Sequence, residues 1–193
     1  MKTIKRIGSV LLLLAAMLWM TACSDMTDGK TFYERAMEKI PLPKGCSEWK
    51  YLPNDYDSDG KIEVFAFGGE EDTPYEQWYY IQVYYIDSQG NVQKVDVGKN
   101  LGGSPYGEKK DFSDCYLTIG KYKYAAFNVG DVYGSCGYSM VLGVYNGRPI
   151  VDYVDGTIDE ITSDGYIMVS GVGADYIYIV RNGQFEIISE IGI

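Results

Sequence analysis

From Trp49 onwards, the apolar residues of this 193-residue chain come in short runs rich in Tyr, Val and Ile, and turn-forming residues separate them. β-branched and aromatic side chains favour strands, because they pack well on a pleated sheet. We predict strands at residues 61–67, 77–86, 92–97, 116–119, 122–128, 138–145, 149–154, 166–170, 175–181 and 184–189. This pattern constrains the chain to an all-β fold.

The turns between these runs indicate how the strands connect. Asn146-Gly147 and Asn182-Gly183 each favour a type I′ hairpin, because both central residues of that turn need a positive φ. Residues 87–91 (DSQGN) predict a longer hairpin loop. Hairpins without intervening helices make an antiparallel meander, here of about ten strands. The 36 residues between the two Asn-Gly pairs hint at a blade-type repeat, so a propeller-like fold stays open beside a sandwich or a barrel.

Residues 1–22 have the order of charges and apolar side chains that is typical of a secretion signal. The basic segment 2–6 precedes the apolar run 10–20, which is short for a membrane span. The segment ends in MTAC (residues 20–23), which resembles the lipobox of bacterial lipoproteins. The resemblance implies cleavage before Cys23 and acylation of its thiol, for example with palmitate. It also implies a protein held by lipid at the cell membrane, facing outside the cytoplasm. The alternative is an ordinary signal peptide.

A polar tether at residues 23–30 precedes a predicted short helix. Thr31 and Glu34 match a capping box, and residues 32–40 place apolar side chains at helical spacing. Pro41 disfavours the helical conformation in the residue before it, so we expect the helix to span residues 31–40. The expected organisation is a signal peptide at 1–22, a tether at 23–30, and a single β-rich domain at 31–193 that begins with this helix.

Charge and composition exclude several classes of function. Without residues 1–22, 14 Lys and Arg stand against 27 Asp and Glu, a formal charge of −13. Nucleic-acid binding depends on Lys and Arg that displace counterions, so we expect no nucleic-acid partner. The chain has no histidine, which excludes Ser-His-Asp and Cys-His nucleophiles and His-ligated zinc. We therefore do not expect an enzyme, although acid–base catalysis by carboxylates alone stays open.

The four cysteines are Cys23, Cys46, Cys115 and Cys136. With lipid on Cys23, three thiols are left, so at most one intramolecular disulfide can form. Cys115 and Cys136 are a candidate pair, and closing their loop would contribute about 3 kcal/mol. The alternative is that the cysteines are buried and reduced.

One segment, DYDSDGKIE at residues 55–63, has a pattern of cation ligands. Its first, third and fifth residues are aspartates, which can converge on one hard cation when the chain wraps around it. Gly60 permits the sharp turn that this wrapping needs. The candidate ligands are the side chains of Asp55, Asp57, Asp59 and Glu63 and the carbonyl of Lys61. A predicted strand follows instead of a helix, and Ala66 stands where an EF-hand has its last Glu, so we do not expect an EF-hand.

This D-x-D-x-D-G-x-x-E pattern before a strand resembles the calcium loops of FG-GAP and VCBS repeats, which occur in integrin-like β-propellers. It is also similar to a segment of exported lipoproteins of Gram-positive gut bacteria. The resemblance covers residues 52–70. It implies that the cation is calcium, bound by the five ligands named above. The alternative is an acidic turn that starts a strand and holds no ion.

The sequence thus predicts a lipid-anchored surface protein with a structural calcium loop and a role in binding or scaffolding. Its partners would be the membrane, through the lipid, and a glycan or another surface protein. One alternative is a glycan-binding module of a nutrient-uptake system, with aromatic rings as a stacking platform. The candidate rings are Tyr75, Trp78, Tyr106 and Tyr133. Another alternative is a carboxylate-dependent hydrolase, which needs two acids converging in a cleft.

Overall fold

A computed structural model describes residues 29–72, 77–98, 101–105, 115–131, 134–171 and 173–192. The predicted signal peptide at 1–22 and the acylation site Cys23 lie outside these residues, as do Tyr75, Tyr106 and Tyr133. Within the described ranges, no helix is long and apolar enough to cross a membrane. The chain falls into two units, Met1–Arg35 and Ala36–Ile193.

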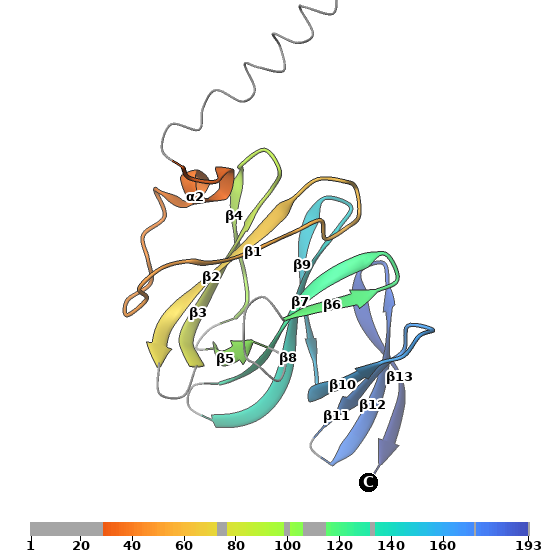
Figure 1. Ribbon diagram of the computed structural model, residues 1–193. Helices are drawn as coiled ribbons and strands as arrows, with labels where there is room; N and C mark the ends of the chain where they lie inside the picture. The colour runs from red at the N-terminus through yellow and green to blue at the C-terminus, as the bar shows by residue number, and fades with distance from the viewer. Residues whose placement is uncertain are drawn as a thin grey trace, which may run out of the picture. The chain divides into compact units, whose positions relative to one another are not determined.

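Strands dominate the described residues, as the sequence predicts (Figure 1). The single described helix is α2 (Phe32–Met37). The strands are β1 (Lys50–Asn54), β2 (Glu63–Asp72), β3 (Gln77–Ile86), β4 (Val92–Val95), β5 (Leu101–Pro105), β6 (Tyr116–Ile119), β7 (Tyr122–Asp131), β8 (Gly134–Tyr145), β9 (Arg148–Val154), β10 (Thr157–Ile161), β11 (Ile167–Ser170), β12 (Ala174–Arg181) and β13 (Gln184–Gly192). All of the strand pairs are antiparallel, which confirms the predicted all-β class.

Helix α2 begins with the predicted capping box. The Thr31 N–H donates to Oε2 of Glu34 at 2.6 Å, and the Glu34 N–H donates to Oγ1 of Thr31 at 3.3 Å. The helix ends at Met37, earlier than the predicted residue 40. There the Ile40 N–H donates to the Met37 carbonyl at 2.9 Å, a three-residue step that tightens the chain into a turn.

Three successive four-stranded meanders make up the β-structure. Strands β1–β4 form the first meander, β6–β9 the second and β10–β13 the third. Strand β5 pairs with both β3 and β7, so it joins the first two meanders into one nine-stranded sheet. The third meander is a separate four-stranded sheet.

Two apolar cores hold these meanders face to face. The first core lies between the first and second meanders, where the rings of Phe67 and Phe127 stack with centroids 4.8 Å apart. The second core lies between the second and third meanders, where Tyr124 meets Phe185 edge to face at 5.3 Å. Strand β7 serves both cores because successive side chains of a strand point to opposite faces. The result is a sandwich-like arrangement of layers (Figure 1).

The predicted hairpin turns occupy equivalent places in the three meanders. The 87–91 loop joins β3 to β4, Asn146-Gly147 joins β8 to β9, and Asn182-Gly183 joins β12 to β13. Each therefore connects the third and fourth strands of its meander. Both Asn-Gly pairs have positive φ, 52° and 70° in the first and 53° and 82° in the second, as a type I′ turn requires.

Three strands were not predicted from the sequence pattern: β1, β5 and β10. Strand β1 contains Pro53, which is normally depleted in strands. Strand β5 contains Gly102 and Gly103, yet a Cβ on Gly103 would lie 2.4 Å from the Asn128 carbonyl oxygen. Glycine is therefore required where β5 lies against β7. Strand β10 is mostly polar and has a bulge near Asp159, so it lacks the apolar alternation of a typical strand.

Candidate metal site

The 55–63 segment forms the loop between β1 and β2, and it folds around one of its own carboxylates. Oδ1 of Asp55 accepts the Asp59 N–H at 3.0 Å, and Oδ2 accepts the Gly60 N–H at 3.1 Å. Ser58 and Gly60 have φ values of 61° and 87°, which let the chain reverse within a few residues. The pairing of Asn54 with Glu63 then closes the loop at the start of the β1–β2 ladder.

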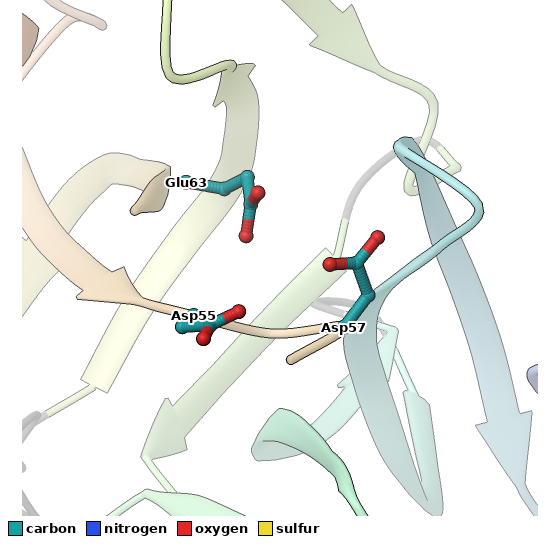
Figure 2. A group of neighbouring side chains, drawn as sticks. All are labelled: Asp55, Asp57 and Glu63. Carbon is teal, nitrogen blue, oxygen red and sulfur yellow. The ribbon is translucent and has the colours of Figure 1, made fainter. Parts of the chain in front are cut away.

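Asp55, Asp57 and Glu63 form an acidic triad. Each contributes one carboxylate oxygen to a group whose members all lie within 4.8 Å of one another. Figure 2 shows the three carboxylates turned toward a common space. Hard cations such as calcium and magnesium prefer oxygen ligands of this kind, so the triad can hold a metal ion.

Asp59, the fourth predicted side-chain ligand, is directed elsewhere. Its carboxylate contacts the ammonium of Lys61 and accepts the Lys61 N–H at 2.9 Å. Both contacts lower the pKa of Asp59, and the contact between the two side chains raises the pKa of Lys61. The structure thus brings three of the four predicted carboxylates together. Coordination by the Lys61 carbonyl stays a prediction.

The two oxygens of Asp57 have different surroundings. Oδ2 accepts the N–H of Gly147, in the β8–β9 turn, at 3.1 Å. Oδ1 is buried and has no hydrogen-bond partner among the described residues. A buried carboxylate oxygen without a partner is costly, so this atom is suited to a cation.

Glu63 is the most deeply buried acid of the triad, with 4% of its surface exposed. Its Oε2 accepts the N–H of Tyr56 at 3.2 Å. Burial raises the pKa of Glu63 to about 7, the Tyr56 N–H opposes this rise, and the three nearby aspartates add to it. A bound cation would offset both the burial and the repulsion between carboxylates.

Tyr56 fixes the loop to the body of the domain. Its side chain is fully buried, its hydroxyl donates to the Leu52 carbonyl at 2.8 Å, and its ring meets Phe65 at 5.0 Å. Its carbonyl accepts the Lys123 N–H at 2.9 Å, and the Ser58 hydroxyl donates to the Lys121 carbonyl. The loop of the first meander is therefore bonded to the second meander.

Sequence reasoning did not find the residues that the loop binds in the second meander. Lys121 is 63 residues from Ser58, and Gly147 is 90 residues from Asp57. Both contribute backbone atoms, which every residue has, so no side-chain pattern could have marked them. The Asn146-Gly147 turn signal located this backbone in a hairpin but not its contact with the loop.

Comparisons with protein-family models, with curated proteins and with solved structures find no match for this chain. The function of the loop is therefore inferred from its own geometry and chemistry.

A second loop of similar sequence connects β10 to β11. Residues 162–165 (TSDG) correspond to residues 57–60 (DSDG), and Gly165 has a φ of 88° where Gly60 has 87°. The registers also correspond: Ile158 pairs with Val169 as Pro53 pairs with Val64. By this correspondence Thr162 and Met168 stand in place of Asp57 and Glu63. Within the described part of the chain, only the β1–β2 loop gathers three carboxylates.

The predicted disulfide concerns residues that are only partly described. Cys115 is fully buried directly before β6. The side chain of Cys136 lies outside the described side chains, so the Cys115–Cys136 pair stays a prediction.

Proposed function

We propose that this protein is a lipid-anchored surface protein whose β1–β2 loop binds calcium, and that the ion stabilises the fold. The observation that carries the calcium proposal is the Asp57 carboxylate, which bonds to Gly147 with one oxygen and leaves the other buried without a described partner. Asp57 is the residue of the triad that connects the loop to the second meander, through its bond to Gly147. An ion on Oδ1 would therefore stabilise both the loop and its contact with the β8–β9 turn.

The ligand set favours calcium over other cations. The chain has no histidine and the triad has no thiolate, so the soft and imidazole ligands preferred by zinc and copper are missing from it. Calcium accepts six to eight oxygens in variable geometry, whereas magnesium demands a near-ideal octahedron. Three carboxylates together with loop carbonyls fit the less demanding ion. The D-x-D-x-D-G-x-x-E pattern supports the same choice.

The burial of Glu63 supports an ion-binding role over a catalytic one. Glu63, whose raised pKa would suit a general acid, is only 4% exposed. A small ion can reach a carboxylate at the base of a loop, but a glycosidic bond has to lie within hydrogen-bond distance of its acid. The hydrolase alternative therefore gains no support from this group.

The expected contribution of calcium is modest. Extracellular calcium modules bind with dissociation constants of roughly 0.1–1 mM. At a calcium concentration about ten times that constant, binding would stabilise the fold by about 1.4 kcal/mol. This magnitude suits a structural ion that is bound under normal conditions outside a cell.

Thermal unfolding in millimolar calcium and in EDTA tests the calcium proposal. We expect the melting midpoint to rise by about 3–6 °C in calcium, because each kcal/mol of stabilisation raises the midpoint of a chain of this length by about 2–4 °C. Asp57→Asn should abolish the rise. Asp155→Asn removes the same charge at an exposed position outside the triad and should retain it. Equal midpoints of the unsubstituted protein in calcium and EDTA would overturn the proposal.

The lipid anchor is supported by residues 1–23 alone. Metabolic labelling with an alkyne analogue of palmitate should mark the protein in membranes, and Cys23→Ala should abolish the label. Recovery of unlabelled protein from the cytosol, with residues 1–22 still attached, would contradict both the anchor and the export.

A further inference from the structure

A hollow of about 440 Å³ opens beside the cation loop. Asp57 and Asp59 of the loop line one side of it, and Asn146 of the β8–β9 turn lines another. Lys121 and Tyr122, at the β6–β7 hairpin, complete the lining. The wall thus consists of three segments that the fold brings together from distant parts of the sequence.

A second hollow, of about 380 Å³, adjoins the first. It is also lined by Lys121 and Tyr122, so these two residues separate the hollows. Its other walls include Asp164 and Tyr166 of the β10–β11 loop and Asn182 of the β12–β13 turn. Both volumes lie in the range of small-ligand sites, about 300–1,000 Å³.

Each of the two hollows contains a carboxylate, a carboxamide and a phenol ring. The Lys121 side chain lines both, Ser58 adds a hydroxyl to the first, and three aliphatic side chains give the second an apolar part: Ile119, Ile179 and Val180. Planar carboxylates and amides can each bond two neighbouring hydroxyl groups, and a phenol ring can stack on the C–H face of a sugar ring. Tyr166 offers such a ring, because it is 39% exposed.

The local charge disfavours a strongly charged ligand. Three acids and one ammonium line the hollows when they are taken together, namely Asp57, Asp59, Asp164 and Lys121. An anion would be repelled by the acids. Calcium in the neighbouring loop would offset part of the negative charge, which also weakens the attraction for a cation. A neutral ligand with many hydroxyl groups suits this balance.

The walls are held in place by contacts within the protein. The Tyr145 hydroxyl donates to Oδ1 of Asn182 at 3.3 Å, which connects the end of β8 to the β12–β13 turn. The Tyr145 ring lies 5.9 Å from that of Tyr122, which connects it to the β6–β7 hairpin. The Gly147 N–H donates to the Asp57 carboxylate, which connects the β8–β9 turn to the cation loop. Because these walls are already fixed, less binding free energy would be lost in ordering the site around a ligand.

We infer that the two hollows form one binding site for an uncharged oligosaccharide, with sugar rings on either side of Tyr122. The site goes beyond the calcium proposal and uses it in two ways: the cation loop forms one wall, and a bound calcium ion lowers the negative charge beside the hollows. Its position also differs from the aromatic platform predicted from the sequence, whose only described ring, Trp78, lines neither hollow.

Isothermal titration of the calcium-loaded protein with neutral hexasaccharides of glucose, xylose and mannose, and with an oligogalacturonate, tests this inference. We expect at least one neutral hexasaccharide to bind and the oligogalacturonate not to bind. Tyr166→Ala should weaken binding about five- to tenfold through the loss of a stacking ring. Asn182→Gly should also weaken binding relative to the unsubstituted protein, because it removes the amide. Glycine suits the φ of 53° at this position.

The matched control is Tyr138→Ala, since Tyr138 is 37% exposed and lines neither hollow. It should bind the hexasaccharide as the unsubstituted protein does. The inference is overturned if no neutral hexasaccharide binds at millimolar concentration, if only the oligogalacturonate binds, or if Tyr138→Ala weakens binding as much as Tyr166→Ala. A calcium-induced rise in melting midpoint would persist in each of these cases, so the two proposals fail separately.

Discussion

Asp57 and Gly147 are joined by a 3.1 Å hydrogen bond across 90 residues of chain, from the backbone of a hairpin turn to a carboxylate of the cation loop. The same carboxylate carries the buried oxygen without a described partner. One side chain therefore belongs both to the acidic triad and to the contact between the first and second meanders. Any ion that fixes this carboxylate also stabilises the turn.

We predict from this contact that calcium slows hydrogen exchange of the Gly147 amide. The amide exchanges when its bond to Asp57 opens, and an ion held by Asp57 makes that opening less frequent. Exchange measured by NMR in calcium and in EDTA should differ about tenfold if the ion contributes about 1.4 kcal/mol. Gly183 occupies the same Asn-Gly turn in the third meander, and its exchange rate should not change. Equal protection of Gly147 in both buffers would show that the ion and the turn are uncoupled.

Glu63 predicts a pH dependence of the calcium-free protein. Burial raises its pKa from 4.5 to about 7 in the folded state, so the fold favours the protonated form. The stability that this group contributes is therefore fully present below about pH 4.5 and is lost as the pH rises through about 7. The loss is on the order of 3 kcal/mol for a shift of this size.

Urea unfolding in EDTA at pH 5 and pH 7.5 measures this effect. Glu63→Gln cannot ionise, so the unsubstituted protein should lose more stability than the variant over this interval. In saturating calcium, ionisation of Glu63 should no longer lower the stability of the unsubstituted protein between pH 5 and pH 7.5, because the ion holds the ionised carboxylate. Parallel pH dependences of the two proteins in EDTA would mean that Glu63 is ionised without cost.

Two buried tyrosine hydroxyls should differ in what they contribute. The Tyr56 hydroxyl donates to the Leu52 carbonyl at 2.8 Å, whereas the Tyr124 hydroxyl is buried with no hydrogen-bond partner among the described residues. Tyr56→Phe should cost about 1 kcal/mol, because it removes a satisfied buried bond. Tyr124→Phe should be neutral or stabilising, because it removes a polar group that burial penalises. Denaturant unfolding of both variants measures this, and an equal loss would point to an unseen partner for Tyr124.

The strands that could be predicted are those whose own side chains carry the signal. Strand β3 spans the predicted residues 77–86, because its aromatic and β-branched side chains suit a strand with neighbours on both sides. Strand β5 could not be predicted, since Gly102 and Gly103 are disfavoured in strands and Gly103 is needed for its close approach to β7. The packing partner, and not the segment itself, determines its structure.

The same distinction holds for the cation loop. The spacing of Asp55, Asp57 and Glu63 is local and was sufficient to predict that they converge. The pairing of Asp59 with Lys61, two residues away, is equally local, but the choice between that ammonium and a cation depends on the folded geometry. The backbone contacts from the second meander have no sequence pattern at all.

Gly143 and Tyr124 are cross-strand partners on β8 and β7, and they provide a test of the second core. A Cβ on Gly143 would lie 2.6 Å from Cδ1 of Tyr124, whose ring also packs edge to face against Phe185. Since the ring cannot shift freely, Gly143→Ala should destabilise the protein by about 1–3 kcal/mol through overpacking. Gly137→Ala on the same strand is the control, because a Cβ there meets no atom within 4 Å and neither glycine has a positive φ. That variant should be neutral or slightly stabilising, since alanine restricts the unfolded chain. If both variants unfold at the same urea concentration as the unsubstituted protein, the Tyr124 ring does not lie over Gly143 in solution.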